Sequence, residues 1–167
     1  ADPWTEIDGE RAHSKSKHPI LSDFAVRQAI SLVVDRDGVQ KYIYGRTGIA
    51  TANFLNNPQR FVSKNTKFEF NVDKANQILE AAGWKKGADG VREKAGKKLK
   101  LVFQTSINGP RQKTQQIIKQ AAQKAGIDLE LKSVPASVYF SSDPANPDTY
   151  TKFFADIQMF TTTMPQP

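Results

Sequence analysis

The chain has 167 residues, of which 38% are hydrophobic and 25% are charged. This is an ordinary globular composition, and the length suffices for one domain with a buried core. The absence of cysteine excludes disulfides, thiolate metal sites and cysteine nucleophiles. No apolar run approaches the ~20 residues that a membrane helix needs, and no signal-peptide pattern is found at the start. The net charge of +7 is compatible with an acidic partner or with solubility alone.

The first half of the chain predicts an extended lead-in, two helices and a loop. Residues 1–17 are polar and aperiodic. Ser22 is the expected cap of a first helix, and Asp35 is the expected cap of a second, short helix that ends at Gly45. Residues 46–71 have few periodic apolar positions and predict a long loop. The apolar face of the first helix consists of Val26, Ala29, Ile30 and Val33.

A third helix is expected between Asn71, which can cap its start, and Gly83, which can adopt a left-handed conformation at its end. Its apolar face consists of Val72, Ala75, Leu79 and Ala82. Trp84 follows, and we interpret it as a side chain packed against this helix rather than as a ligand-stacking ring. The Asp89-Gly90 and Ala95-Gly96 pairs then predict a turn and a hairpin that lead into the first strand.

The remainder of the chain predicts a strand–helix–strand unit. Residues 99–104 and 127–134 have the apolar patterns of strands, and a helix between Pro110 and Gly126 connects them. Two strands joined by one helix in so short a segment pair in parallel through a right-handed crossover. Residues 155–161 are a further strand candidate. The side chains expected in the core are Val26, Ala29, Ile30, Val33, Leu79, Leu101, Phe103, Ile117, Ala121, Leu129, Leu131 and Ile157. These elements predict an α/β fold, with a mixed sheet flanked by helices.

The segment 81–106, which runs from the end of the third helix through the first strand, is glycine-rich and carries seven basic residues. A calcium loop needs alternating acidic ligands, whereas only Asp89 and Glu93 are available here. A phosphate loop needs a strand before the glycines and a helix after them, which is the reverse of the order expected here. Binding of nucleic acid or of an anionic surface remains the alternative hypothesis, although Trp84 is the only aromatic residue nearby for base stacking.

The sequence contains no recognisable catalytic set. His13 and His18 are the only histidines, and both lie near the polar lead-in without further metal ligands around them. The Gly-x-Ser-x-Gly pattern of a nucleophile elbow is absent. We therefore expect neither an enzyme nor a protein with a metal or another cofactor.

Four segments, taken in order, resemble the family 5 solute-binding proteins of ABC transporters, the class that binds oligopeptides, dipeptides and nickel. They are HPILSDFAVRQAISLVVDRDGV (18–39), YIYGRTGIA (42–50), NVDKANQILEAAGWKKGADGVREKAGKKLKLVFQTS (71–106) and RQKTQQIIKQAAQKAGIDLELKSV (111–134). The resemblance extends over about Glu10 to Phe160. It implies a type II periplasmic-binding-protein-like fold, in which two lobes close around a ligand.

The resemblance also implies how the chain is organised and which partners it has. The chain would be an interior fragment of the second lobe, with residues 1–17 as lead-in, 18–160 as core and 161–167 as a segment on the cleft side. Its partners would be a small peptide or peptide-like solute, the permease subunits of an ABC importer and the first lobe of the same protein, but no nucleic acid. The receptor would be periplasmic or held at the cell surface.

Candidate ligand-binding residues follow from the position of ligands in open α/β folds, beyond the carboxyl ends of parallel strands. Thr105 and Asn108 follow the first expected strand, and the 51–55 loop is a second candidate region. The full set of candidates is Asn53, Phe54, Thr105, Asn108, Thr161, Thr162 and Thr163. We expect this set to converge on one face of the molecule, away from the lysine-rich hairpin at 94–98.

The resemblance gives the three threonines further significance. Many members of the family carry an aromatic residue and an aspartate shortly after the strand that corresponds to 157–160. The threonines at 161–163 favour neutral hydrogen bonding with apolar contact instead of a charge pair with a peptide amino terminus. The alternative is that they are ordinary residues at the end of a strand.

Overall fold

The computed structural model describes residues 6–55 and 57–162. Its helices are α1 (Phe24–Leu32), α2 (Arg36–Val39), α3 (Val72–Ala81), α4 (Gly109–Lys124) and α5 (Ala136–Tyr139). The shorter helical turns are the π-helix η1 (Gln40–Tyr44) and the 3-10 turns η2 (Gly45–Thr47) and η3 (Gln59–Phe61). The strands are β1 (Lys85–Lys86), β2 (Arg92–Lys94), β3 (Lys97–Lys98), β4 (Lys100–Ser106), β5 (Asp128–Val134) and β6 (Ile157–Met159).

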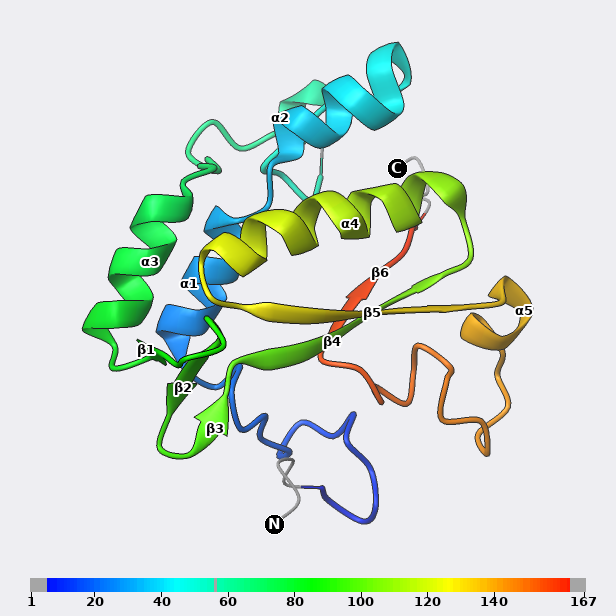
Figure 1. The fold of residues 1–167 in the computed structure, drawn as a ribbon. Helices are drawn as coiled ribbons and strands as arrows, with labels where there is room; N and C mark the ends of the chain where they lie inside the picture. The colour runs from blue at the N-terminus through cyan, green and yellow to red at the C-terminus, as the bar shows by residue number, and fades with distance from the viewer. Residues whose placement is uncertain (1–5, 56, 163–167) are drawn as a thin grey trace.

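The larger sheet is parallel and has the strand order β5–β4–β6. Strands β4 and β5 pair along their full length, from Lys100 opposite Asp128 to Ser106 opposite Val134, and helix α4 connects them. The predicted parallel strand–helix–strand unit is therefore confirmed. Helix α4 covers one face of this sheet, while α1 and α3 pack against each other at one end of it (Figure 1).

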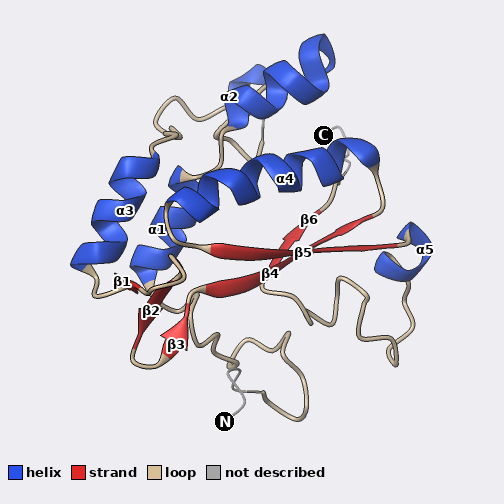
Figure 2. Ribbon diagram, viewed as in Figure 1, coloured by secondary structure: helices blue, strands red, loops and turns tan. Residues whose placement is uncertain are grey.

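The antiparallel strands form a sheet of their own, with the order β1–β2–β3. The structure thus contains the expected parallel and antiparallel pairings, but in two separate sheets instead of one mixed sheet (Figure 2). Both predicted turns are present. Gly90 has φ +79°, and Ala95 and Gly96 have φ +51° and +74°, as a two-residue hairpin with two left-handed positions requires.

Capping side chains set the starts of the helices. Asp35 and Asn71 accept hydrogen bonds from the backbone N–H groups of Gly38 and Lys74, as predicted. The predicted cap of α1 was wrong, because Asp23, not Ser22, accepts from the Ala25 N–H at 2.9 Å. The hydroxyl of Ser22 donates to the His18 carbonyl instead of capping the helix, and the carboxylate of Asp23 also accepts from Trp84 and Lys94.

The predicted core is largely confirmed. Its buried members are Val26, Ala29, Val33, Leu79, Leu101, Phe103, Ala121 and Leu129, and Ile30, Leu131 and Ile157 pack against them partly buried. Ile117 was placed in this core wrongly, because it is half-buried and outside the cluster, whereas its neighbour Ile118 is 7% exposed. Ile118 shares the inward stripe of α4 with Ala121, Ala122 and Ala125 at the i+3, i+4 and i+7 positions.

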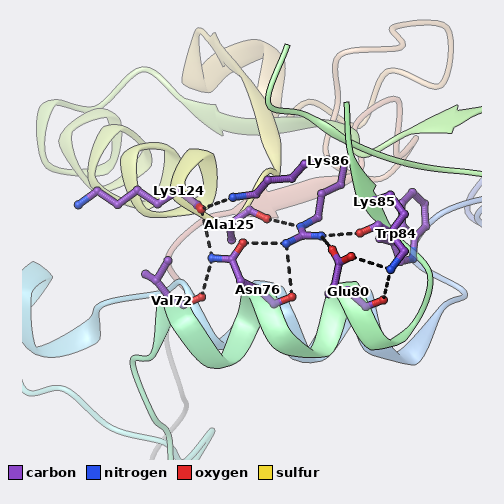
Figure 3. Close-up of polar contacts among 9 residues, drawn as sticks. Val72, Asn76, Glu80, Trp84, Lys85, Lys86, Lys124 and Ala125 are labelled. Atoms are coloured by element: carbon purple, nitrogen blue, oxygen red, sulfur yellow. Dashed lines mark hydrogen bonds and ion pairs between the residues drawn. The ribbon is translucent and has the colours of Figure 1, made fainter. Parts of the chain in front are cut away.

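One buried guanidinium joins the small sheet to the ends of two helices. Arg92 on β2 is 3% exposed. It donates to the carbonyl of Ala125 after α4 at 2.8 Å, to the carbonyl of Trp84 after α3, to Asn76 Oδ1 at 2.8 Å and to Glu80 Oε2 at 2.7 Å. Figure 3 shows Asn76 and Glu80 rising from α3 toward this centre, with Ala125 on the opposite side. The carbonyls at helix ends lack intrahelical donors, and the guanidinium of Arg92 donates hydrogen bonds in their place.

We expect Arg92→Met to lower the free energy of unfolding by roughly 2–4 kcal/mol, because it leaves buried acceptors without a donor. Urea denaturation measures the loss. Lys85→Met is the matched control, since Lys85 also pairs with Glu80, at 2.6 Å, but its side chain is 63% exposed. This control should change stability by less than about 1 kcal/mol. Equal losses in the two variants would show that Arg92 is not a structural centre.

Candidate functional site

The carboxyl ends of the parallel strands meet beside the start of α4 (Figure 1). Thr105 is fully buried there, and its hydroxyl donates to the Met159 carbonyl at 2.7 Å, which ties β4 to β6. The side chain of Asn108 caps α4 by accepting from the Arg111 N–H at 3.2 Å. Both candidate side chains are thus engaged in shaping this edge of the sheet.

A cavity of about 520 Å³ opens at this edge. It lies between the α2–η2 region, the loop that follows it, the first half of α4 and the end of β6. Thr161, one of the predicted site residues, lines it together with Thr51. The other lining residues are Val34, Arg36, Val39, Gln40, Tyr44, Thr47, Gly48, Ile49, Ala50, Thr114, Ile118 and Met159. A second cavity of about 460 Å³ shares Ile49, Ala50 and Thr51 with the first.

The remaining predicted site residues lie outside the lining of this cavity. Asn53 holds the loop together, because its side-chain amide bonds both the N–H and the carbonyl of Ser63. The ring of Phe54 is 78% exposed. Thr162 is exposed beside Thr161, and Thr163 lies outside the described residues. The structure therefore brings only part of the predicted set together, and a ligand-binding role for each member stays a prediction.

Arg36 is the one charged residue among the described residues that line the cavity. Arg36 lines it, with its guanidinium 5.2 Å from the centre of the Phe68 ring. Burial lowers the pKa of Arg36, but an arginine remains charged at neutral pH. Among the described residues, no aspartate or glutamate lines the cavity. A ligand that carries negative charge would therefore meet attraction and no opposing carboxylate.

An aromatic cluster, which the sequence analysis missed, stands next to this edge. Tyr139, Phe140, Tyr150 and Phe160 pack with ring centres 4.9–6.3 Å apart. Phe160 directly precedes Thr161, so the cluster adjoins the cavity through the chain itself. No periodic pattern in the sequence links these residues, because they come from α5, the following loop and the end of β6.

Tyr139 carries a buried hydroxyl without a hydrogen-bond partner in the described part of the chain. Burial raises the pKa of Tyr139 to about 12, against the opposing effect of the positive charge on Arg111. The phenol is thus neutral at physiological pH, and it does not compensate the charge of the arginine.

The lysine-rich hairpin lies at the opposite end of β4 (Figure 1). Most of its cations have acidic partners. Lys98 pairs with Asp89, Lys94 contacts Asp23 at 3.0 Å, and Lys100 lies 3.8 Å from Glu130. Burial would raise the pKa of Asp23, but hydrogen bonds from Trp84 and Lys94 lower it. Cations neutralised in this way are poor phosphate ligands, which weakens the hypothesis of nucleic-acid binding.

His18 has a structural role. Its Nδ1 accepts from the Ile20 and Leu21 N–H groups, and its Nε2 lies 2.7 Å from Asp156 Oδ1.

Residues 6–55 and 57–162 contain no group of three or more histidine, cysteine, aspartate or glutamate side chains placed to hold a metal ion. None of the helices in these two ranges has both the length and the apolar character that crossing a bilayer requires.

The α/β architecture of the chain matches that of solved proteins with the type II periplasmic-binding fold. Comparison with known proteins leads to the same class. The family model described as "Bacterial extracellular solute-binding proteins, family 5 Middle" matches residues 11–164. The chain belongs to this family of solute-binding proteins.

Individual relatives agree with this assignment. Oligopeptide-binding protein AppA of Bacillus subtilis is 29% identical over 127 residues, which cover 71% of this chain and 23% of that protein. The oligopeptide-binding protein of Thermus thermophilus, solved with a pentapeptide, aligns with a TM-score of 0.69 and 26% identity over 81% of this chain and 23% of that one. NikZ from Campylobacter jejuni, solved with Ni(L-His), aligns with a TM-score of 0.66 and 28% identity over 73% and 25% of the two chains. This chain thus spans about a quarter of the length of these relatives.

The buried phenol of Tyr139 generates a prediction about pH. Between pH 10 and 12 the unfolded chain loses the Tyr139 proton while the folded chain keeps it, so the folded state is progressively destabilised as the pH rises. We expect the stability of the wild-type protein to fall relative to Tyr139→Phe over this range and to run parallel to it below pH 9. Urea denaturation at a series of pH values measures this difference, in which the titration of the lysines cancels. A constant difference from pH 8 to 12 would contradict the prediction.

Proposed function

We propose that this chain is the part of the second lobe that captures the solute in an extracytoplasmic receptor, and that the receptor delivers peptide-like solutes to an ABC importer. The observation that carries this proposal is the cavity at the carboxyl end of β6, beside α4. It lies where open α/β folds bind ligands. Its volume of about 520 Å³ is in the range of small-molecule sites.

The relatives support the class of solute. Two of them are oligopeptide-binding proteins, and one of these was solved with a pentapeptide. A third was solved with Ni(L-His), in which an amino acid accompanies the metal. The lining of the cavity is mostly apolar and includes the polar side chains of Gln40, Thr51 and Thr161. This combination suits a peptide, which needs both apolar contact and hydrogen bonds.

The rest of the receptor completes the proposed site. Because this chain spans about a quarter of its relatives, a first lobe of the same protein would close over the cavity and supply its other wall. The permease subunits of the importer would receive the solute from the closed receptor. The receptor would work in the periplasm or at the cell surface, in keeping with the extracellular family to which the chain belongs.

Filling the cavity should abolish peptide binding by the full-length protein. Thr51 lines both cavities, so Thr51→Trp places an indole where the peptide would lie. Native mass spectrometry with a defined pentapeptide mixture identifies bound peptides, and calorimetry then measures their Kd. We expect Thr51→Trp to weaken binding at least about tenfold, equivalent to about 1.4 kcal/mol.

The matched control reverses charge on the lysine-rich hairpin. Lys97→Glu with Lys98→Glu lies at the far end of β4 and should leave peptide affinity unchanged. If the double variant weakened binding while Thr51→Trp did not, the ligand would bind at the hairpin and the proposed site would be wrong.

A further inference from the structure

The segment 40–68, which leads from α2 toward α3, differs from the rest of the chain in its charge. It contains five basic residues and no acidic residue, so it contributes +5 to the net charge of +7. The other 138 residues contribute only +2, from 19 basic and 17 acidic residues. The five cations are Lys41, Arg46, Arg60, Lys64 and Lys67.

These cations are exposed and have no acidic partner. All five residues are exposed, and within the described parts of the chain no carboxylate oxygen lies within 4.0 Å of their charged groups. Two of them contact aromatic rings of the segment itself. Lys41 Nζ lies 5.1 Å from the centre of the Tyr42 ring, and Arg60 Cζ lies 4.9 Å from that of Phe61. Their positive charge is therefore available to an external partner.

The same segment carries the most exposed large hydrophobic side chains of residues 6–55 and 57–162. Ile49 is 87% exposed, Phe54 is 78% exposed and Tyr42 is 73% exposed. Leu55 and Phe61 are exposed as well. Single exposed apolar side chains are common on protein surfaces, whereas a group of them marks a site that contacts a protein or a membrane.

Hydrogen bonds within the segment hold these side chains in one region. Gln40 Oε1 accepts from the Ala50 N–H, and the Asn53 side chain bonds both backbone groups of Ser63. The cavity of about 460 Å³ is lined by residues from both halves of the segment, which places the halves next to each other. Figure 1 shows the segment above α4, with the large sheet and the lead-in at 6–17 below that helix. We call residues 40–68 the cationic–aromatic surface.

We propose that the cationic–aromatic surface binds a membrane that contains anionic lipids. Basic side chains are attracted to anionic headgroups, and tyrosine favours the level of these headgroups. Phenylalanine and leucine beside lysine and arginine are characteristic of segments that bind a bilayer surface without crossing it. A protein interface has a different pattern, because its charged residues are depleted from an apolar centre. Here each exposed ring of Tyr42 and Phe61 adjoins a cation.

This proposal goes beyond the proposed function, because it requires no solute. The test measures how the full-length protein, prepared without lipid modification, cosediments with vesicles. One set consists of phosphatidylcholine, and the other contains about 30% phosphatidylglycerol as the anionic lipid. We expect binding to the anionic vesicles alone, and we expect it to weaken as salt is raised above ~0.1 M, because salt screens exposed charges. Failure to bind the anionic vesicles would overturn the proposal and would indicate that the rest of the receptor or another protein covers this surface.

A pair of charge variants locates the binding. Arg60→Gln with Lys64→Gln should weaken binding to the anionic vesicles about 10- to 30-fold, since each cation near such a surface strengthens binding roughly fivefold. The matched control is Lys15→Gln with Lys17→Gln. It removes the same charge from exposed residues of the lead-in, on the other side of the molecule (Figure 1), and it should bind like the wild type. Equal losses in the two double variants would assign binding to the overall charge of the protein and refute the site.

An apolar pair tests whether side chains enter the bilayer. Tyr42→Ser should weaken vesicle binding about fivefold, because it removes an exposed ring from the surface. Phe24→Ser is the matched control, since Phe24 is 61% exposed on α1, outside the cationic–aromatic surface. It should leave vesicle binding unchanged. If Phe24→Ser weakened binding as much as Tyr42→Ser did, the cationic–aromatic surface would not be the membrane contact.

Discussion

The buried Arg92 is the interaction on which the arrangement of this fold depends. Its guanidinium reaches the carbonyl ends of α3 and α4 from a short hairpin strand. The hairpin by itself has only two- and three-residue strands, too few to be stable alone. When Arg92 docks onto the two helix ends, it therefore stabilises the hairpin. It also donates to carbonyl oxygens that would otherwise be buried without a donor.

The turn at Gly126 makes this docking possible. Gly126 has φ +80°, and a Cβ atom there would lie 2.7 Å from Arg92 Cγ and 3.1 Å from the carbonyl oxygen of Gly90. Its carbonyl accepts the Arg92 N–H at 2.8 Å. A glycine is thus required both for the left-handed conformation and for the close approach of the hairpin. With its carboxyl end held in this way, the 16-residue helix α4 carries its first turn, with Arg111, to the other end of the sheet.

The two ends of the parallel sheet differ in how charge is balanced. At the amino end of β4, lysines such as Lys94 and Lys98 pair with aspartates. At the carboxyl end, Arg111 is held by hydroxyl groups and Arg36 faces a cavity whose described lining has no acid. Much of the positive charge clustered near the hairpin is therefore paired with carboxylates within the fold.

The sequence by itself determined what depends on neighbouring residues. Asp35 and Asn71 were recognisable as caps, and Gly83 as a helix end, because each acts on backbone groups a few residues away. The parallel pairing of β4 and β5 followed from apolar periodicity and from the length of the connection. The order of several such local signals also sufficed to identify the family.

Only the tertiary structure decided the features that depend on distant partners. Asp23, which caps α1, also accepts a hydrogen bond from Trp84, 61 residues away, and the position of α4 on the sheet leaves Ile117 half-buried outside the core. Thr161 accepts a hydrogen bond from Arg111, 50 residues earlier in the chain. Periodicity and turn chemistry report only on local geometry. Contacts of this kind depend on how whole elements pack, which no short window of the sequence encodes.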